Sequence, residues 1–100
     1  MPKVLLIDDD PQDLEILTEQ LRELGSEPIT ARNLQAALKI LDENSSIDLL
    51  LADIHLPDGK GSDLLEKTSL PVLLITAHAE IEDAVEAMRR GAFHYFTKPV

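Results

Sequence analysis

The fold is decided by one stretch, Ile47-Asp48-Leu49-Leu50-Leu51-Ala52-Asp53, and by the loop after it, Ile54-His55-Leu56-Pro57-Asp58-Gly59-Lys60-Gly61. A short apolar run bounded by turn residues predicts a strand that is buried on both faces. It ends in a carboxylate, Asp53, and breaks at once into a loop containing proline and glycine. Such a carboxylate lies where open α/β sheets place their ligand sites. Considered alone, Asp53 is better explained as a turn aspartate or a helix N-cap than as a functional residue.

Polar residues also follow three further runs of strand-like character. They are Asp8 and Asp9 after residues 4–7, Thr76 after residues 72–75, and Lys98 after residues 93–97. Each has an ordinary explanation: the acids could begin a helix, Thr76 could belong to a turn, and Lys98 could be a solvated lysine. Because parallel strands bring their carboxyl ends to one edge of the sheet, the set as a whole favours a functional site.

The composition is that of one globular domain with many acidic residues. The length of 100 residues matches the usual size of a single domain. The chain has no cysteine, which excludes disulfides and thiolate metal sites. No apolar run approaches the ~20 residues of a membrane span, so we expect a cytoplasmic protein without membrane contact. The formal net charge of −10 argues against direct nucleic-acid binding.

Strands and helices are expected to alternate along the chain. The expected strands cover residues 4–7, 27–31, 47–53, 72–75 and 93–97, and the expected helices cover residues 11–24, 34–41, 62–67 and 81–90. Asp10 followed by Pro11 is typical of a helix start, and Gly25 of a helix end. Pro28 suits a strand at the edge of a sheet, because proline cannot donate to the ladder.

The alternation predicts an α/β fold with a doubly wound parallel sheet of five strands. Right-handed crossovers with strand order 2-1-3-4-5 would put the first helix on one face and the next three on the other. Strands three to five would then lack a helix on the first helix's face, because no fifth helix precedes the end at Val100. We therefore expect residues 1–100 to be one domain that is shortened at its C-terminus. It is either a fragment or a naturally shortened domain that covers this face by association, as a homodimer or a swapped assembly.

The order 2-1-3-4-5 would bring the acids together at the switch point between strands one and three. Carboxylates from Asp8, Asp9 and Asp53 repel one another there, and a divalent cation relieves that repulsion. Mg²⁺, or Mn²⁺ in its place, binds carboxylate oxygens and leaves room for water and a phosphate oxygen. Thr76 and Lys98 suit phosphoryl oxygens. Asp53 stands singly opposite the pair, so it is the best candidate for a nucleophile that forms an aspartyl-phosphate.

Other chemistries find less support in the same loops. His55 and His78 among acids could bind a transition metal, but no ligand spacing such as i, i+4 joins them. Gly59-Lys60-Gly61 lacks the upstream glycine and the following Ser or Thr of a phosphate-binding P-loop.

The chain resembles the receiver domain of two-component response regulators over its whole length. The motifs that carry the resemblance are residues 4–10 (VLLIDDD), 53–57 (DIHLP) with Gly61, 75–78 (ITAH) and 91–99 (GAFHYFTKP). Residues 75–99 most resemble receivers of the nitrogen-regulator type, which are fused to ATPase and DNA-binding domains. The resemblance implies the flavodoxin-like fold of CheY-like receivers, with strand order 2-1-3-4-5, four helices here and no fifth helix.

The resemblance implies a metal-assisted phosphoacceptor site. Asp53 would accept a phosphoryl group from the phosphohistidine of a sensor histidine kinase. Asp9, Asp53 and the backbone carbonyl of His55 would bind Mg²⁺ directly, and Asp8 would act mostly through water.

The remaining motif residues would shape the switch and its loops. Thr76 and Tyr95 would form the switch pair, and Lys98 would contact a phosphoryl oxygen. The bond before Pro99 would be cis. Pro57 and Gly61 would be the characteristic residues of the loop that follows Asp53.

The implied function is phosphorelay signalling in the cytoplasm, without turnover of an external substrate. Phosphorylation would change the conformation that controls an output domain or effector protein, with transcription regulation as the output of the parent protein. Because the last helix of the family is absent, output through the face that it helps to form is in question. Two alternatives are a Mg²⁺-dependent phosphohydrolase and a pseudo-receiver that never takes phosphate, and the complete set of acids, threonine and lysine weighs against the second.

Overall fold

Five parallel strands form the central sheet of the computed structural model, which describes residues 2–44, 46–76 and 81–97. They are β1 (Lys3–Ile7), β2 (Glu27–Ala31), β3 (Leu49–Asp53), β6 (Val72–Thr76) and β7 (His94–Thr97). Their order in the sheet is β2-β1-β3-β6-β7, and every neighbouring pair is parallel. The predicted α/β class and the order 2-1-3-4-5 are therefore confirmed.

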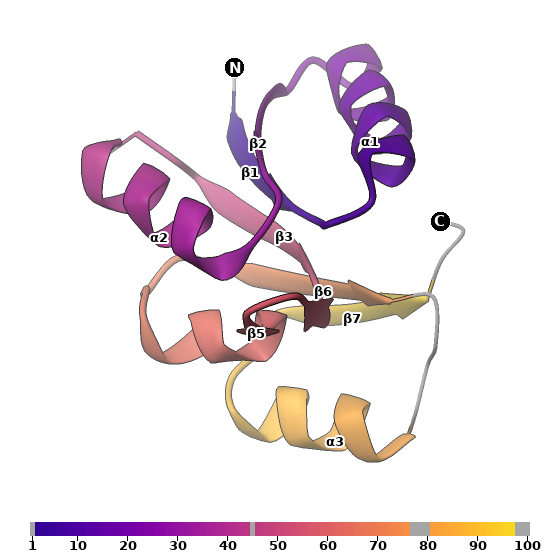
Figure 1. The fold of residues 1–100 in the computed structure, drawn as a ribbon, viewed down its shortest axis with the longest axis vertical. Helices are drawn as coiled ribbons and strands as arrows, with labels where there is room; N and C mark the ends of the chain where they lie inside the picture. The colour runs from indigo at the N-terminus through magenta and orange to yellow at the C-terminus, as the bar shows by residue number, and fades with distance from the viewer. Residues whose placement is uncertain (1, 45, 77–80, 98–100) are drawn as a thin grey trace.

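The helices cover the two faces of the sheet unequally. They are α1 (Pro11–Glu23), α2 (Leu34–Glu43), the 3-10 helix η1 (Gly61–Glu66) and α3 (Ile81–Arg89). Figure 1 shows α1 on one face and the other three on the opposite face, as the right-handed crossovers require. Within the described ranges, no helix is long and apolar enough to cross a membrane.

The core has two layers because the strands are buried on both faces. Leu5 belongs to the larger cluster, which α2 and η1 help to form, whereas its neighbour Leu6 belongs to the smaller cluster under α1. This alternation follows from the two-residue period of a strand, and it explains the nearly continuous apolar runs in the sequence. Leu14 and Leu17 of α1 close the smaller cluster.

The helix start predicted at Asp10 and Pro11 and the helix end predicted at Gly25 are present, and α2 is capped as well. The carboxylate of Asp10 accepts the amide hydrogen of Gln12 at 2.9 Å, and Pro11 is the first residue of α1. The side chain of Asn33 caps α2 by accepting the amide hydrogen of Ala36 at 2.7 Å. Gly25 follows the end of α1 with a φ of +83°, a conformation that glycine adopts without strain.

Residues 47–67 differ from the prediction in three ways. β3 begins at Leu49, two residues later than expected, because Asp48 first exchanges hydrogen bonds with Lys3. The residues after Asp53 form a small antiparallel hairpin, β4 (His55–Leu56) and β5 (Gly59–Lys60), where an irregular loop was expected. The helix expected at residues 62–67 is the 3-10 helix η1.

One sheet face carries apolar side chains without a described helix over them. Phe96 of β7 is in register with Ile75 of β6, and both belong to the cluster on the α1 side of the sheet. In the part of the chain that the structure describes, α1 is the helix on this side, and it lies over β1 and β2 (Figure 1). Phe96 remains half-buried, and its ring stacks on that of His94 with centroids 4.3 Å apart.

Candidate functional site

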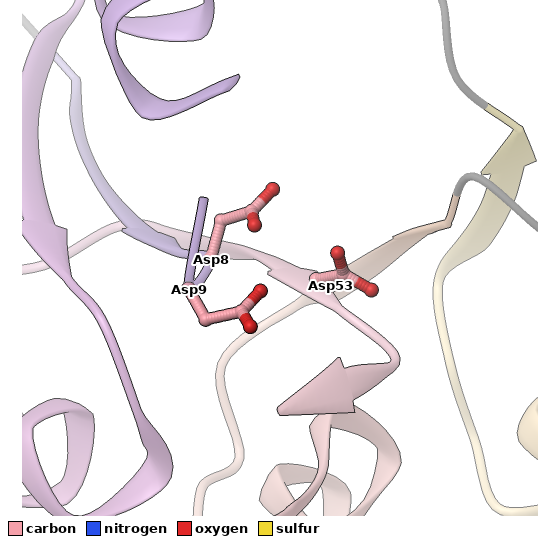
Figure 2. Close-up of side chains that lie close together, drawn as sticks. All are labelled: Asp8, Asp9 and Asp53. Atoms are coloured by element: carbon pink, nitrogen blue, oxygen red, sulfur yellow. The ribbon is translucent and has the colours of Figure 1, made fainter. Parts of the chain in front are cut away.

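Three carboxylates converge at the carboxyl end of the sheet. Asp8 and Asp9 directly follow β1, and Asp53 is the last residue of the neighbouring strand β3. Each of the three offers a carboxylate oxygen, and these oxygens all lie within 4.8 Å of one another. Figure 2 shows the side chains of Asp8 and Asp9, which follow β1, beside that of Asp53. The cluster therefore forms at the switch point where the sequence placed it.

Backbone contacts fix the two buried acids. Asp8 is 1% exposed: its amide donates to the carbonyl of Ala31, and its carboxylate accepts the amide hydrogen of Asp10, both at 3.0 Å. Asp53 is 7% exposed, and its Oδ1 accepts the amide hydrogen of His55 at 3.0 Å. Two of the three negative charges are therefore held in place and away from bulk water.

Asp9 is the exposed member of the cluster. The guanidinium of Arg32, which follows β2, donates from Nη2 to the backbone carbonyl of Asp9 at 3.2 Å. This contact holds the segment between β1 and α1 beside the sheet edge. Arg32 was not predicted from the sequence, because a lone arginine 23 residues away carries no local signal of this contact.

The donor set fits a hard divalent cation. Mg²⁺ prefers oxygen ligands, with few carboxylates and several waters, whereas softer metals prefer nitrogen or sulfur. The cluster consists of carboxylates, and no histidine of the described residues joins it. A mixed set of buried and exposed acids leaves one side accessible to water and to a further oxygen ligand. The histidine-based transition-metal alternative has no support from this geometry for His55, and His78 lies outside the described residues.

Thr76 and Tyr95 lie on the strands beyond Asp53. Thr76 is 1% exposed and ends β6, in which the preceding residue, Ile75, is paired with Asp53. Tyr95 is half-buried in β7, in register with Leu74, and packs against the larger core cluster. The predicted Lys98 and Pro99 lie outside the described residues.

The loop after Asp53 requires a glycine at position 61. A Cβ at Gly61 would collide with the backbone carbonyl oxygen of Asp53. The amide of Gly61 also donates to the carbonyl of Ile54 at 2.9 Å, which brings the chain back against the end of β3. Pro57 is exposed between β4 and β5. Gly61 thus has a steric reason for its place, which the resemblance alone did not provide.

Asp58 is a further residue that the sequence analysis did not identify. Its carboxylate accepts the amide hydrogens of Leu34 at 2.8 Å and of Gln35 at 3.0 Å, at the start of α2. These two donors, that of Leu34 first, hold the pKa of Asp58 below its ordinary value of 3.8. In the sequence Asp58 looks like a turn residue between Pro57 and Gly59, and its partners lie more than twenty residues earlier.

The sequence and the fold are similar to those of known proteins. The family model described as "Response regulator receiver domain" matches residues 4–100. The chain belongs to the response regulator receiver family.

The response regulator protein PilR of Pseudomonas aeruginosa is 37% identical over 103 residues, which cover 98% of the receiver chain and 23% of PilR. The transcriptional regulatory protein GlrR of Escherichia coli is 34% identical, over 97% of the receiver chain and 23% of GlrR. The receiver chain thus spans less than a quarter of the length of these relatives.

Solved receiver structures share the fold. A response regulator receiver domain protein from Clostridium thermocellum has a TM-score of 0.93 and 34% identity, and the match covers all of the receiver chain and 84% of that protein. The beryllofluoride-activated NtrC4 receiver domain dimer has a TM-score of 0.91 and 31% identity, with coverage of 100% and 86%. The receiver family and the similarity to receivers of the nitrogen-regulator type, both inferred from the motifs, are thereby confirmed.

Proposed function

We propose that this receiver accepts a phosphoryl group on Asp53 from the phosphohistidine of a sensor histidine kinase, in the presence of Mg²⁺. The observation that carries the proposal is the convergence of Asp8, Asp9 and Asp53, with carboxylate oxygens within 4.8 Å at the carboxyl ends of β1 and β3. Membership of the receiver family supports it independently. The domain catalyses its own phosphorylation and dephosphorylation, and it has no external substrate to turn over.

The transfer forms one bond and breaks one. A carboxylate oxygen of Asp53 attacks phosphorus, a P–O bond forms, and the P–N bond of the donor breaks. The electron pair of that bond stays on the imidazole nitrogen of the kinase, which takes up a proton. In dephosphorylation, water attacks phosphorus, the P–O bond to Asp53 breaks, and inorganic phosphate leaves with the carboxylate restored.

The residues of the chain position the reacting carboxylate. Asp9, Asp53 and the carbonyl of His55 would hold Mg²⁺, with Asp8 acting through water. When bound, the ion neutralises charge on the phosphoryl oxygens. The amide of His55, at 3.0 Å from Oδ1 of Asp53, orients the carboxylate so that its other oxygen is available for attack. Burial of Asp8 and Asp53 strengthens each of these electrostatic contacts.

The switch would run from Asp53 to β6 and β7. Thr76 is buried at the end of the strand beside β3, within the layer that also contains the half-buried Tyr95. In the phosphorylated state the hydroxyl of Thr76 would turn toward the phosphoryl group, and the ring of Tyr95 would move inward. Lys98 and Pro99, which the receiver motif assigns to the same switch, lie outside the described residues. This is a two-state element that a local change in charge biases.

The output of the parent protein would be transcription regulation in the cytoplasm. GlrR is named as a transcriptional regulatory protein and PilR as a response regulator, and both are much longer than this receiver. The receiver would act on an attached output domain or an effector protein. Its net charge of −10 argues against direct DNA binding by this domain.

The apolar sheet face around Ile75 and Phe96 would be covered by a second copy. These side chains have no described helix over them, and the solved NtrC4 receiver is a dimer. Association would remove the apolar surface of β6 and β7 from water. The two copies would thus cover this face of each other's sheet in a homodimer or a swapped assembly.

Phosphorylation with a small-molecule donor tests the proposal. The protein is incubated with acetyl phosphate and Mg²⁺, and its intact mass is recorded with and without the ion. We expect one added phosphoryl group that needs both Mg²⁺ and Asp53. Asp53→Asn should remain unmodified, whereas the control Asp42→Asn, an exposed acid of α2, should behave like wild type. Modification of Asp53→Asn to the wild-type level would overturn the proposal.

A further inference from the structure

The hairpin of residues 55–60 joins the acid cluster to helix α2. β4 and β5 pair His55 with Lys60 and Leu56 with Gly59, so that Asp58 lies in the turn between the two strands. From there its carboxylate reaches the first turn of α2 and accepts two amide hydrogens, those of Leu34 at 2.8 Å and Gln35 at 3.0 Å. A charged acceptor at a helix N-terminus makes strong hydrogen bonds and also matches the helix dipole.

Close packing supports this contact. A Cβ at Gly59 would lie 2.6 Å from Cδ1 of Leu34, so the backbone of the turn passes directly over this side chain. Leu34 is buried, and so is Leu56 of the hairpin. The turn therefore rests directly on the start of α2, and the two carboxylate hydrogen bonds fix its position along the helix.

The other end of the hairpin contacts the phosphoacceptor. His55 begins β4, and its amide donates to Oδ1 of Asp53 at 3.0 Å. Its backbone carbonyl is one of the proposed Mg²⁺ ligands. Displacement of the turn would therefore move the amide and the carbonyl of His55 together. Asp58 itself makes no described hydrogen bond to Asp53, Asp8 or Asp9.

We propose that Asp58 is a positioning residue of the phosphoacceptor site, which it serves by fastening the hairpin of residues 55–60 to helix α2. The inference rests on the proposed function, because it assigns Asp58 a share in the Mg²⁺ affinity of that site. The ordinary alternative is that Asp58 only caps α2 and contributes to stability alone.

α2 offers a control that separates these two roles. Asn33 caps the same helix by accepting the amide hydrogen of Ala36 at 2.7 Å, but it precedes the helix directly and does not contact the hairpin in any described hydrogen bond. Asn33→Ala thus removes a cap and keeps the hairpin fastened. Asp58→Ala removes a cap and, with it, the hydrogen bonds that join the hairpin to α2.

Magnesium affinity and thermal stability, measured together, decide between the roles. Loss of either cap should lower the melting temperature by about 4–8 °C. In calorimetric titrations with Mg²⁺, Asp58→Ala should bind about tenfold more weakly than wild type, a usual effect of removing support for a metal ligand. Asn33→Ala should keep wild-type affinity. Equal affinities of the two variants would overturn the positioning role.

Two further measurements distinguish a failure of the positioning role from a failure of the proposed function. Asp58→Asn retains one acceptor oxygen, so its affinity should lie between those of wild type and Asp58→Ala, even if the alanine variant folds poorly. Without metal, the amide resonance of His55 should shift in Asp58→Asn and stay in place in Asn33→Ala. An unmoved resonance in Asp58→Asn contradicts the positioning role alone, whereas absence of Mg²⁺ binding by wild type overturns the proposed function and the inference with it.

Discussion

At the scale of single residues, the site depends on backbone contacts as much as on the acids themselves. The motif identified Asp53 and the pair Asp8 and Asp9 because carboxylates at strand ends are visible in a sequence. Their supports are not visible. Arg32 reaches the carbonyl of Asp9 from β2, and the amide of His55 orients Asp53. These contacts depend on where the chain returns in space, so residue type and spacing could not predict them.

Gly61 should tolerate no side chain. Gly61→Ala would drive a methyl group into the carbonyl of Asp53, and we expect a loss of about 1–3 kcal/mol in the free energy of unfolding. Gly25→Ala is the control, because a Cβ there meets open space and suffers only from the positive φ, at about 1 kcal/mol. Urea unfolding compares the two. A Gly61→Ala variant no less stable than Gly25→Ala would contradict the steric argument.

Asp58 should make stability depend on pH in the acidic range. Its pKa is lowered in the folded state, because the amides of Leu34 and Gln35 stabilise the charged form. Its contribution is therefore fully present above the ordinary pKa of 3.8 and is lost as the pH falls through the lowered folded-state pKa. Urea unfolding from about pH 3 to about pH 7 should show wild type and Asp58→Asn differing most near neutrality and converging in acid. A difference that grows in acid would contradict this sign.

At the scale of elements, the sequence predicted the long elements well and the short ones poorly. Apolar periodicity and caps located α1 and α2, and alternation located the strands, because each spans enough residues for a pattern to repeat. β4 and β5 have two residues each, so they show no period, and only the turn between them could be expected. The 3-10 form of η1 likewise leaves little trace in six residues. The hairpin that carries the support of the site was therefore the part least accessible to prediction.

Arg90 should hold α3 against η1. Its guanidinium donates to Glu66 at 2.8 Å and to the buried Ser62 at 3.2 Å. Arg90→Lys keeps the charge but loses the two-pronged geometry, so we expect a loss of about 1 kcal/mol in the free energy of unfolding. Arg89→Lys, at an exposed neighbour, should change it by less than about 0.5 kcal/mol. Equal stability of the two variants in chemical unfolding would show that the contact contributes nothing.

At the scale of the whole molecule, the unequal cover of the sheet is the main consequence of the topology. Among the described residues, the order 2-1-3-4-5 puts one helix on the α1 side and three on the other, as crossover handedness predicted from the sequence. The proposed cover of β6 and β7 by a second copy is a property of an assembly, which the residue pattern of a single chain does not predict.

The apolar face around Phe96 should therefore drive association. Phe96→Gln should reduce both the binding of a hydrophobic dye and the concentration-dependent dimer fraction in light scattering, because it makes the centre of the face polar. Phe93→Gln is the control: Phe93 is 67% exposed but precedes β7. A protein that remains a monomer at high concentration and binds no dye would contradict the assembly proposed here.

The central claim, that Asp53 is the phosphoacceptor, is tested most directly by trapping the acyl phosphate. After incubation with acetyl phosphate and Mg²⁺, borohydride reduces an aspartyl-phosphate to homoserine, and peptide sequencing locates the modified position. We predict modification at Asp53 in a Mg²⁺-dependent manner and none at Asp8 or Asp9. Modification at another residue, or none at Asp53 in a protein that binds Mg²⁺, would contradict the claim.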